Sequence, residues 1–515
     1  MLSAQLSYDI TDWLNISGRV RVDNTHTKYE QKLYASSNLT ITEESTQGHY
    51  TISKPDETQT YADVLANINK RFNDFSLVAN VGASIVNNRY EDLSYRGPIR
   101  EKGIPNVFNV FDLDNTKKKA RQDEWQEQTQ SVFASVEVGW KSMLYLTLTG
   151  RNDWASQLAN SSTPCFFYPS VGLSGVISEM LTLPEFIDYM KVRGSFSSVG
   201  MPYPRNLTSP TYEYDEANQQ WKPKTHYPIK DLKPERTNSW ELGLDMRLFK
   251  DFSLGFSWYL ANTFNQTFDP KVSVSSGYSK IYLQTGYVRN SGVELSLGYG
   301  HTWNNHLHWE SNFTLSHNKN TIKDLVTSYI HPETGLPITQ NRLDVGGLGK
   351  ARFILKKGGT LGDLYTQSDL KRDNSGMVEI DPSGALTTED NLPDIKLGSV
   401  FPKANLAWNN RFEWRGISLS ALFTARIGGI AYSATQAAMD QYGVSERSAQ
   451  ARDNGGVLLN GRTLVDAQTY YSLIGNSSGL PQYYTYSATN VRLQEASVGY
   501  TLSLIHISEP TRLAL

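Results

Sequence analysis

The sequence has one cysteine, Cys165, among its 515 residues, so it can form no intramolecular disulfide. A lone cysteine is ordinarily a small buried thiol, and we do not predict that Cys165 acts as a nucleophile. The formal net charge of −3 provides no basic footprint for nucleic acid. No run of about 18 apolar residues occurs, so no membrane-spanning helix is predicted.

Catalytic motifs are missing as well. The sequence contains no H-E-x-x-H, and its one G-x-S-x-G match, residues 475–479, lies inside a long polar segment instead of at the strand-to-helix turn that this motif requires. The acidic pairs Glu43-Glu44 and Glu389-Asp390 show no spacing that would hold two catalytic carboxylates at a set separation, and we interpret them as charged loop surface. The glycine-rich residues 345–351 lack the spacing and the following helix of a phosphate-binding loop. We therefore predict no enzyme activity, no catalytic residue and no cofactor.

A possible metal site needs separate treatment. His306, His308 and Glu310 alternate along one predicted strand and could present three ligands on one face. They follow a predicted turn at Asn304-Asn305, where polar side chains are ordinary. We therefore predict no metal site.

The sequence does have a repeated alternation of apolar and polar residues. Successive strand side chains point to opposite faces, so each alternating run has one apolar and one polar face. In residues 240–248, the apolar set is Trp240, Leu242, Leu244, Met246 and Leu248, and the other set is Glu241, Gly243, Asp245 and Arg247. The same alternation occurs in residues 132–140, 144–149, 293–300 and 417–424, where Leu422 breaks the rule. Roughly fifteen such strands can be counted.

Short turns alternate with long polar segments along the chain. Asn, Asp, Gly and Ser indicate the short turns, near residues 11–13, 73–74, 141–142, 250–251, 304–305 and 415–416, with a longer one at 181–187. The long segments lie at about 26–57, 87–126, 152–165, 200–235, 264–287, 320–400 and 429–488. Loops this long are rare in compact soluble domains.

These features together predict an all-β fold, a transmembrane antiparallel β-barrel with long external loops and short periplasmic turns. A soluble β-sandwich or propeller also has alternating strands. A propeller would show a regular blade repeat, and none is visible.

The chain ends carry a separate expectation. The first residues lack the basic and apolar regions of a secretory signal. Residues 502–515 resemble a non-native read-through tail, so residues 1–501 are expected to form a partial, truncated barrel domain without a plug. An open barrel edge leaves backbone groups unpaired in lipid, and we do not expect this fragment to insert stably alone.

Several segments resemble, in order and spacing, the SusC/RagA family of TonB-linked outer-membrane proteins from Bacteroidetes-type bacteria. Residues 232–245 resemble the family's L-x-P-E … E-x-G-x-D strand entry, and residues 288–295 its N-x-G-x-E strand. Residues 357–365 resemble G-x-x-x-G-x-x-Y, and residues 397–403 with 423–429 resemble G-x-x-x-P … F-x-x-x-x-G-G. Residues 189–195 and 491–500 are similar to further family strands. The family's plug, TonB-contacting segment and last strands are not visible.

The resemblance implies active import across the bacterial outer membrane. A wide barrel is normally closed by a plug, and a TonB complex would supply energy. A SusD-like surface lipoprotein would cap the external loops, and the cargo would be an oligosaccharide or a peptide. No substrate-binding residue can be assigned. Aromatic residues of two long loops could stack on sugars or pack loop against loop: Tyr212, Tyr214, Trp221 and Tyr227 in one, and Tyr470, Tyr471, Tyr483, Tyr484 and Tyr486 in the other.

Three rival functions remain open at this point. A passive porin would share the barrel without TonB or a plug. An outer-membrane enzyme would need a catalytic set on the barrel. A soluble all-β adhesin or carbohydrate-binding protein would partition into the aqueous phase after detergent extraction.

Overall fold

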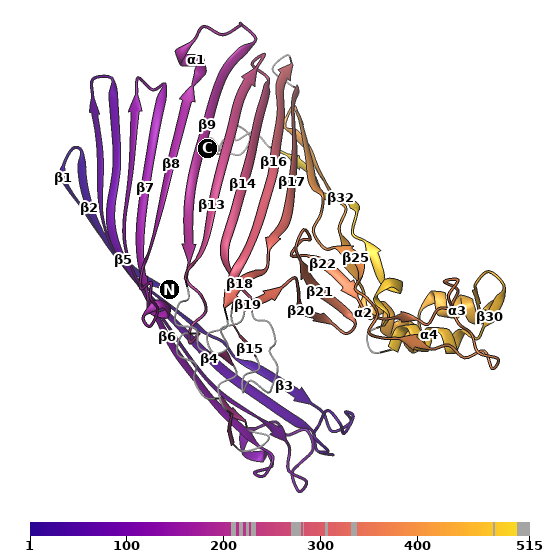
Figure 1. The fold of residues 1–515 in the computed structure, drawn as a ribbon. Coiled ribbons are helices and arrows are strands. Elements are labelled where there is room, and N and C mark those ends of the chain that lie inside the picture. The colour runs from indigo at the N-terminus through magenta and orange to yellow at the C-terminus, as the bar shows by residue number, and fades with distance from the viewer. Residues whose placement is uncertain are drawn as a thin grey trace, which may run out of the picture. The chain divides into compact units, whose positions relative to one another are not determined.

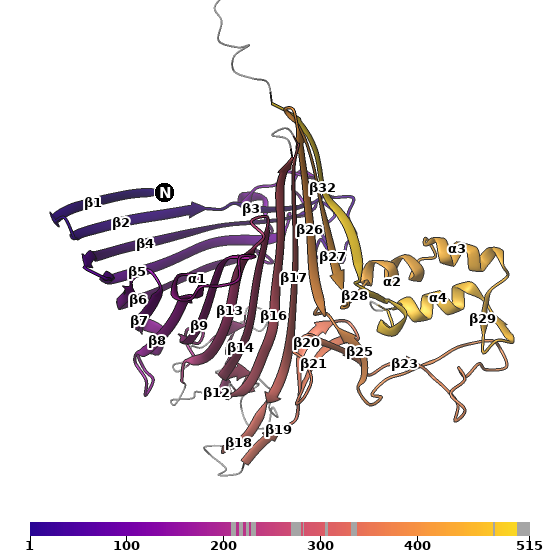
Figure 2. The same cartoon turned by 90° about the horizontal axis from the view of Figure 1, so that it is seen from above.

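The computed structural model describes residues 1–207, 213–215, 220–222, 226–227, 233–268, 280–281, 283–303, 307–330, 337–476 and 479–501. Most strands in these stretches belong to one large sheet (Figures 1 and 2). Its strands are β1 (Leu2–Thr11), β2 (Leu14–His26), β3 (Tyr29–Leu33), β4 (His49–Phe72), β5 (Phe75–Pro98), β6 (Lys119–Trp140), β7 (Leu144–Ala155), β8 (Phe166–Val176), β9 (Ile187–Met201), β13 (Glu235–Leu248), β14 (Phe252–Phe268), β16 (Leu283–Trp303), β17 (Leu307–Asp324), β26 (Ala404–Trp414), β27 (Ile417–Ile427) and β32 (Asn490–Tyr500).

The remaining elements are short and occur, in sequence, in the connections between strands of the large sheet. The strands are β10 (Glu213–Asp215), β11 (Gln220–Lys222), β12 (His226–Tyr227), β15 (Lys280–Ile281), β18 (Val326–Ile330), β19 (Pro337–Gln340), β20 (Arg342–Leu348), β21 (Ala351–Lys356), β22 (Asp363–Thr366), β23 (Asp369–Leu370), β24 (Thr388–Glu389), β25 (Ile395–Ser399), β28 (Ile430–Tyr432), β29 (Val457–Leu459), β30 (Thr463–Val465) and β31 (Thr485–Ser487). The α-helices are α1 (Ile177–Met180), α2 (Ala434–Gln441), α3 (Glu446–Asp453) and α4 (Ala467–Gly475). Among the described residues, none of these helices has the length and apolar character needed to cross a membrane.

The large sheet has 16 strands within the described residues. Its order is β1-β2-β4-β5-β6-β7-β8-β9-β13-β14-β16-β17-β26-β27-β32, with β3 attached to β4. Strands β1 to β7 on this path pair antiparallel in turn, and so do β14 to β32. The predicted antiparallel sheet of about fifteen strands is confirmed. Strands β1 and β32 stand at the two ends of this order.

The chain divides into two compact units. Unit 1 contains Met1–Leu173, Ser197–Arg236 and Lys271–Tyr282, and unit 2 contains Ser174–Phe196, Thr237–Pro270 and Leu283–Leu515. In unit 1, Leu77, Val138 and Leu146 are cross-strand partners in one row. Asn80, Ser135 and Thr149 form another row, whose side chains point to the opposite face because strand side chains alternate.

Unit 2 has the same two faces over six strands. One cross-strand row contains Leu254, Leu297, Phe313, Trp408, Phe423 and Leu493. The next row contains Gly255, Ser296, Thr314, Ala407, Thr424 and Arg492. We call these the apolar face and the polar face. Leu297 is 41% exposed and Trp408 47% exposed, so the apolar face forms an outer surface rather than a dry core. Such a surface suits contact with lipid.

Several strands extend further than the alternation predicted. β4 and β5 contain 24 residues each and β6 contains 22, so the predicted loops at 26–57 and 87–126 are wrong at their edges. Thr51 pairs with Arg96 and Asp92 with Asp123 in regular ladders there. A membrane-spanning strand needs only about 9–11 residues. Polar residues lie on both faces of the extra length, and the few apolar residues there, such as Ile52 and Leu93, make no sustained alternation in the sequence.

The short turns lie where they were predicted, among the described residues. Strand β26 ends at Trp414 and β27 begins at Ile417, which leaves Arg415 and Gly416 as a two-residue hairpin turn. Both turn residues have positive φ angles, 47° and 86°, as this hairpin type requires. The predicted Asn304-Asn305 turn lies outside the described residues. The connection between β8 and β9 begins with α1, which was not predicted.

Two predicted loops in unit 2 contain folded structure. Strands β20, β21, β22 and β25 form a four-stranded sheet within residues 320–400. Residues 430–487 contain α2, α3 and α4, which lie together (Figure 2). Residues 369–389 pack against residues 430–487, and we call the two segments together the loop body. They share one core of Leu370, Val378, Leu386, Ala437, Val465, Tyr470, Ile474, Leu480 and Tyr484.

Candidate functional site

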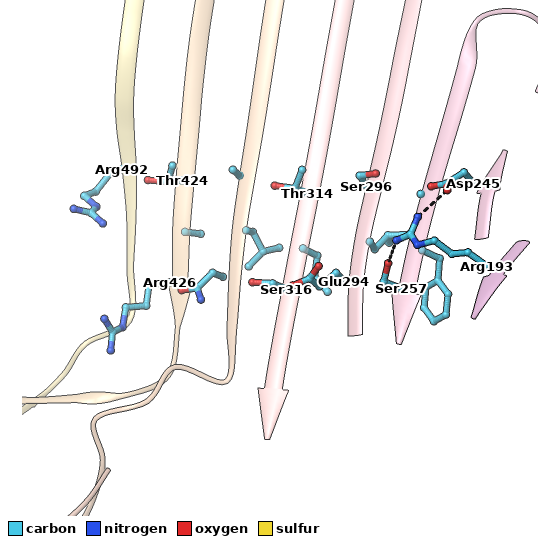
Figure 3. Close-up of a pocket in the computed structure, with 18 residues that line it drawn as sticks. Arg193, Asp245, Ser257, Glu294, Ser296, Thr314, Ser316, Thr424, Arg426 and Arg492 are labelled. Carbon is cyan, nitrogen blue, oxygen red and sulfur yellow. Dashed lines mark hydrogen bonds and ion pairs between the residues drawn. The ribbon is translucent and has the colours of Figure 1, made fainter. Parts of the chain in front are cut away.

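A hollow of about 590 Å³ lies on the polar face of unit 2 (Figure 3). Its polar lining comes from strands β9 to β32 and consists of Arg193, Asp245, Ser257, Glu294, Ser296, Thr314, Ser316, Asn405, Thr424, Arg426 and Arg492. Hydroxyl, amide, carboxylate and guanidinium groups therefore surround one space. Such a mixture of donors and acceptors suits reversible binding of a polar ligand.

One end of the hollow is organised around Arg193 of β9. Its guanidinium donates to Asp245 Oδ2 at 2.8 Å, to Ser257 Oγ at 2.7 Å and to Glu241 Oε1 at 3.3 Å. A Cβ atom at Gly243 would lie 2.5 Å from Arg193 Nε, so only glycine leaves room for this side chain. The E-x-G-x-D motif therefore supplies two carboxylates and a gap for one arginine.

The N-x-G-x-E segment has a similar explanation. A Cβ at Gly292 would lie 2.4 Å from the Tyr259 hydroxyl oxygen, because the Tyr259 ring crosses over this glycine. The Tyr259 hydroxyl donates to Asn318 Oδ1 at 3.1 Å, and Asn318 donates to Asn290 Oδ1 at 3.3 Å. The last residue of the motif, Glu294, lines the hollow.

The double glycine after β27 redirects the chain beside the hollow. Gly428 and Gly429 have φ angles of 76° and 84°, which favour glycine. A Cβ at Gly429 would lie 3.2 Å from both Val400 O and Arg426 Nη2. Arg426 Nη2 donates to Val400 O at 2.6 Å. The two halves of the G-x-x-x-P … F-x-x-x-x-G-G pairing are thus held together next to the hollow.

The G-x-x-x-G-x-x-Y segment anchors the four-stranded sheet of unit 2. Asp363 is buried and accepts hydrogen bonds from Thr360 Oγ1 at 2.7 Å and from Lys396 Nζ at 2.5 Å. A Cβ at Gly362 would lie 2.9 Å from side-chain atoms of Phe401. This motif is therefore structural and does not contribute to the hollow.

Aromatic rings cluster near the short turns on the apolar face of unit 2. Ring centroids lie 4.7 Å apart for Phe252 and Tyr299, and 5.1 Å apart for Tyr299 and Trp309. Trp309 and Phe412 stack at 5.6 Å with an interplanar angle of 3°. Aromatic girdles of this kind occur where a barrel meets the membrane interface. The aromatic residues that flank short turns in unit 1 are Trp13, Phe72, Phe75 and Trp140.

Two of the residues considered as possible metal ligands, His308 and Glu310, make ordinary polar contacts. His308 Nδ1 lies 2.9 Å from Thr302 Oγ1, and Glu310 accepts from Asn312 at 2.8 Å. His306 lies outside the described residues. No cluster of three His, Cys, Asp or Glu residues suited to a metal is present in the described part of the chain.

The glycine-rich residues 345–351 form the hairpin between β20 and β21. Lys350 Nζ there lies 2.9 Å from Asp390 Oδ1. The segment is thus strand and turn, and α-helix does not follow it. Cys165 is a free, half-buried thiol.

The loop aromatics divide between packing and exposure. Tyr470 and Tyr484 are buried in the core of the loop body, which favours packing of loop against loop. Tyr486 is 42% exposed and Trp221 66% exposed. Tyr212 and the side chains of Tyr214 and Tyr227 lie outside the described residues.

A buried carboxylate links three elements of the loop body. Asp440 of α2 is 1% exposed and accepts from Ser445 Oγ at 2.5 Å, from Tyr484 Oη at 3.0 Å and from Arg447. Burial alone would raise the pKa of Asp440. The hydrogen bonds from Arg447, Ser445 and Tyr484 outweigh burial, so the pKa lies below its ordinary value.

Comparison with known proteins identifies the class of this fold. Residues 1–492 match the family model of the TonB dependent receptor-like β-barrel, and the chain belongs to this family. TonB-dependent receptors are transporters of the outer membrane that work with TonB. The outer-membrane location predicted for the protein is confirmed.

Individual relatives agree with the family. The chain is 23% identical to TonB-dependent receptor P39 of Formosa agariphila over 339 residues, which cover 63% of this chain and 30% of the relative. It is also 23% identical to TonB-dependent receptor P26 of the same organism over 350 residues, which cover 63% of this chain and 34% of that relative. The chain thus spans about a third of the curated relatives it matches.

Solved structures share the fold. The structure of the RagAB peptide transporter matches with a TM-score of 0.75 and 16% identity, over 99% of this chain and 56% of that one. The RagAB peptide importer in the 'open-open' state matches with a TM-score of 0.73. The family model thus confirms that the chain is a TonB-dependent receptor barrel, and the RagAB structures confirm the SusC/RagA-like fold.

Proposed function

We propose that the intact protein actively imports oligosaccharides or peptides across the outer membrane, driven by a TonB complex. The match of residues 1–492 to the TonB-dependent receptor barrel family carries this proposal. An apolar face for lipid and a polar face for cargo support it, because a transport barrel needs both. Residues 1–501 contribute part of the barrel, and no bond of the cargo is broken.

A SusD-like surface lipoprotein completes the proposed importer. The fold likeness to the RagAB peptide importer supports such a partnership and makes peptides one of the two cargo classes. The loop body offers this lipoprotein a folded surface. Its shared core joins residues 369–389 to residues 430–487, so it presents a fixed shape instead of two independent loops.

Energy dependence separates this function from its main rival, a passive porin. Cells that carry the intact protein should accumulate a fluorescent peptide or oligosaccharide, and loss of TonB or of the proton-motive force should abolish accumulation. The matched control is a strain without the protein. Uptake that continues without TonB would favour the porin.

A further inference from the structure

Charge is distributed unevenly along the hollow on the polar face of unit 2. The Arg193 end is neutralised, because Asp245 and Glu241 both accept from this guanidinium. Figure 3 places Arg426 and Arg492 together at the opposite end. Neither of these two arginines has a carboxylate within ion-pair distance among the described residues.

The Arg426 end also contains polar atoms without partners. Arg426 Nη2 donates to Val400 O, but Arg426 Nε is buried and has no hydrogen-bond partner in the described structure. The same holds for Thr424 Oγ1 and for Asn490 Oδ1. Arg426 is the cross-strand partner of Asn490, and Thr424 is that of Arg492. Buried polar groups normally form a hydrogen bond, so these unpaired atoms indicate a place where a ligand can supply the missing partner.

The middle of the hollow limits where a negative ligand can lie. Glu294 lies between the two ends (Figure 3) and has no ion pair among the described residues. Its carboxylate would repel an anion placed beside it. The Arg426 end is therefore the part of the hollow that favours a negative group.

We infer that Arg426 and Arg492, with the hydroxyl of Thr424, bind a carboxylate carried by the cargo. This inference rests on the proposed import function and narrows its substrate class to acidic cargo. A guanidinium fits a carboxylate through two parallel N–H···O hydrogen bonds, and a threonine hydroxyl can donate a third. The carboxylate can belong to the free C-terminus of a peptide or to a uronic acid in an oligosaccharide.

Two probe pairs test the inference in cells that carry the intact protein. One pair is a short labelled peptide with a free C-terminus and the same peptide as its C-terminal amide. The other is a labelled glucuronic-acid oligosaccharide and its neutral glucose counterpart. We expect wild-type protein to take up the acidic member of at least one pair preferentially. In R426Q/R492Q, uptake of that member should fall about tenfold or more, as expected when charge-assisted hydrogen bonds are lost, and uptake of the neutral member should fall much less.

Controls separate binding from structure. R247Q removes an arginine from the polar face of β13 outside the hollow and should leave the acidic preference intact. Heat-modifiable gel mobility should be the same for wild type and all variants. An equal loss of acidic and neutral uptake in R426Q/R492Q, or no acidic preference in wild type, would overturn the inference but leave import standing. Uptake of no probe by wild type would contradict the proposed function itself.

Discussion

Glycine on the polar face of the sheet makes space for a larger side chain from the next strand. Gly243 lies under Arg193 and Gly292 under Tyr259 in unit 2. In unit 1, a Cβ at Gly139 would lie 2.9 Å from the Tyr145 ring. Each large side chain is thereby held flat against the sheet. These three glycines are thus explained by cross-strand packing, because none of them has a positive φ angle, unlike Gly428 and Gly429.

The substitution G243A tests this packing at the level of one residue. The new Cβ would collide with the Arg193 guanidinium, which is held in place by Asp245 and Glu241. We expect the free energy of unfolding of the intact protein to fall by about 1–3 kcal/mol, as for other overpacked sites. Urea unfolding in lipid vesicles measures the change. G300A is the control, since a Cβ there would meet nothing within 4 Å, and equal effects of both substitutions would contradict the explanation.

At the scale of the strand, alternation decides which environment each side chain meets. Leu297 and Ser296 are adjacent on β16 and lie on opposite faces. Leu297 belongs to a row of apolar side chains across six strands, whereas Ser296 lines the hollow. Sequence periodicity could predict this difference because it is a property of each strand alone. It could not predict the extensions of β4 to β6, where polar residues lie on both faces and apolar residues do not alternate over a long run.

Arginine substitutions on the two faces should therefore differ in cost. L297R places a charge on the lipid face and should destabilise the folded barrel by about 2–4 kcal/mol, the cost measured for Arg near the bilayer midplane. S296R places the same charge on the polar face and should cost far less. Urea unfolding in vesicles measures the free energy, and the heat-modifiable band reports the folded fraction in cells. Equal costs would mean that the apolar face does not contact lipid.

At the scale of the whole molecule, segments far apart in sequence meet in the loop body. Asn460 Oδ1 accepts from Val378 N at 2.9 Å, and Asn460 Nδ2 donates to Val378 O at 2.9 Å, across 82 residues. Asp440 similarly connects α2 to Arg447 of α3 and to Tyr484. Strands β26 and β27 of the sheet lie between the two segments in the sequence. The loop body is thus a folded structure with its own buried charge.

Acid should loosen the loop body through Asp440. Its pKa is lowered in the folded protein, so its contribution to stability is present above the unfolded pKa of about 3.9 and is lost as pH falls through the folded value. We expect hydrogen-exchange protection of α2 and α3 to decrease below about pH 4. D440N should already lower the free energy of opening of α2 and α3 at pH 7, by about 1–3 kcal/mol. Its hydrogen-exchange protection should then fall less steeply than that of wild type as the pH is lowered. The exposed residue Asp453 supplies the control variant D453N, and an acid response of D440N as steep as that of wild type would contradict this role.

The amino-acid sequence by itself determined the strands, the short turns and the two faces of the sheet. These depend on local alternation and turn residues, which each segment carries alone. Only the tertiary structure decided which residues form the hollow. Arg193, Glu294 and Arg426 lie on strands far apart in sequence, and cross-strand register alone brings their side chains to one space. The core of the loop body was decided in the same way, because burial of Tyr470 and Tyr484 depends on Leu370 and Val378 from another loop.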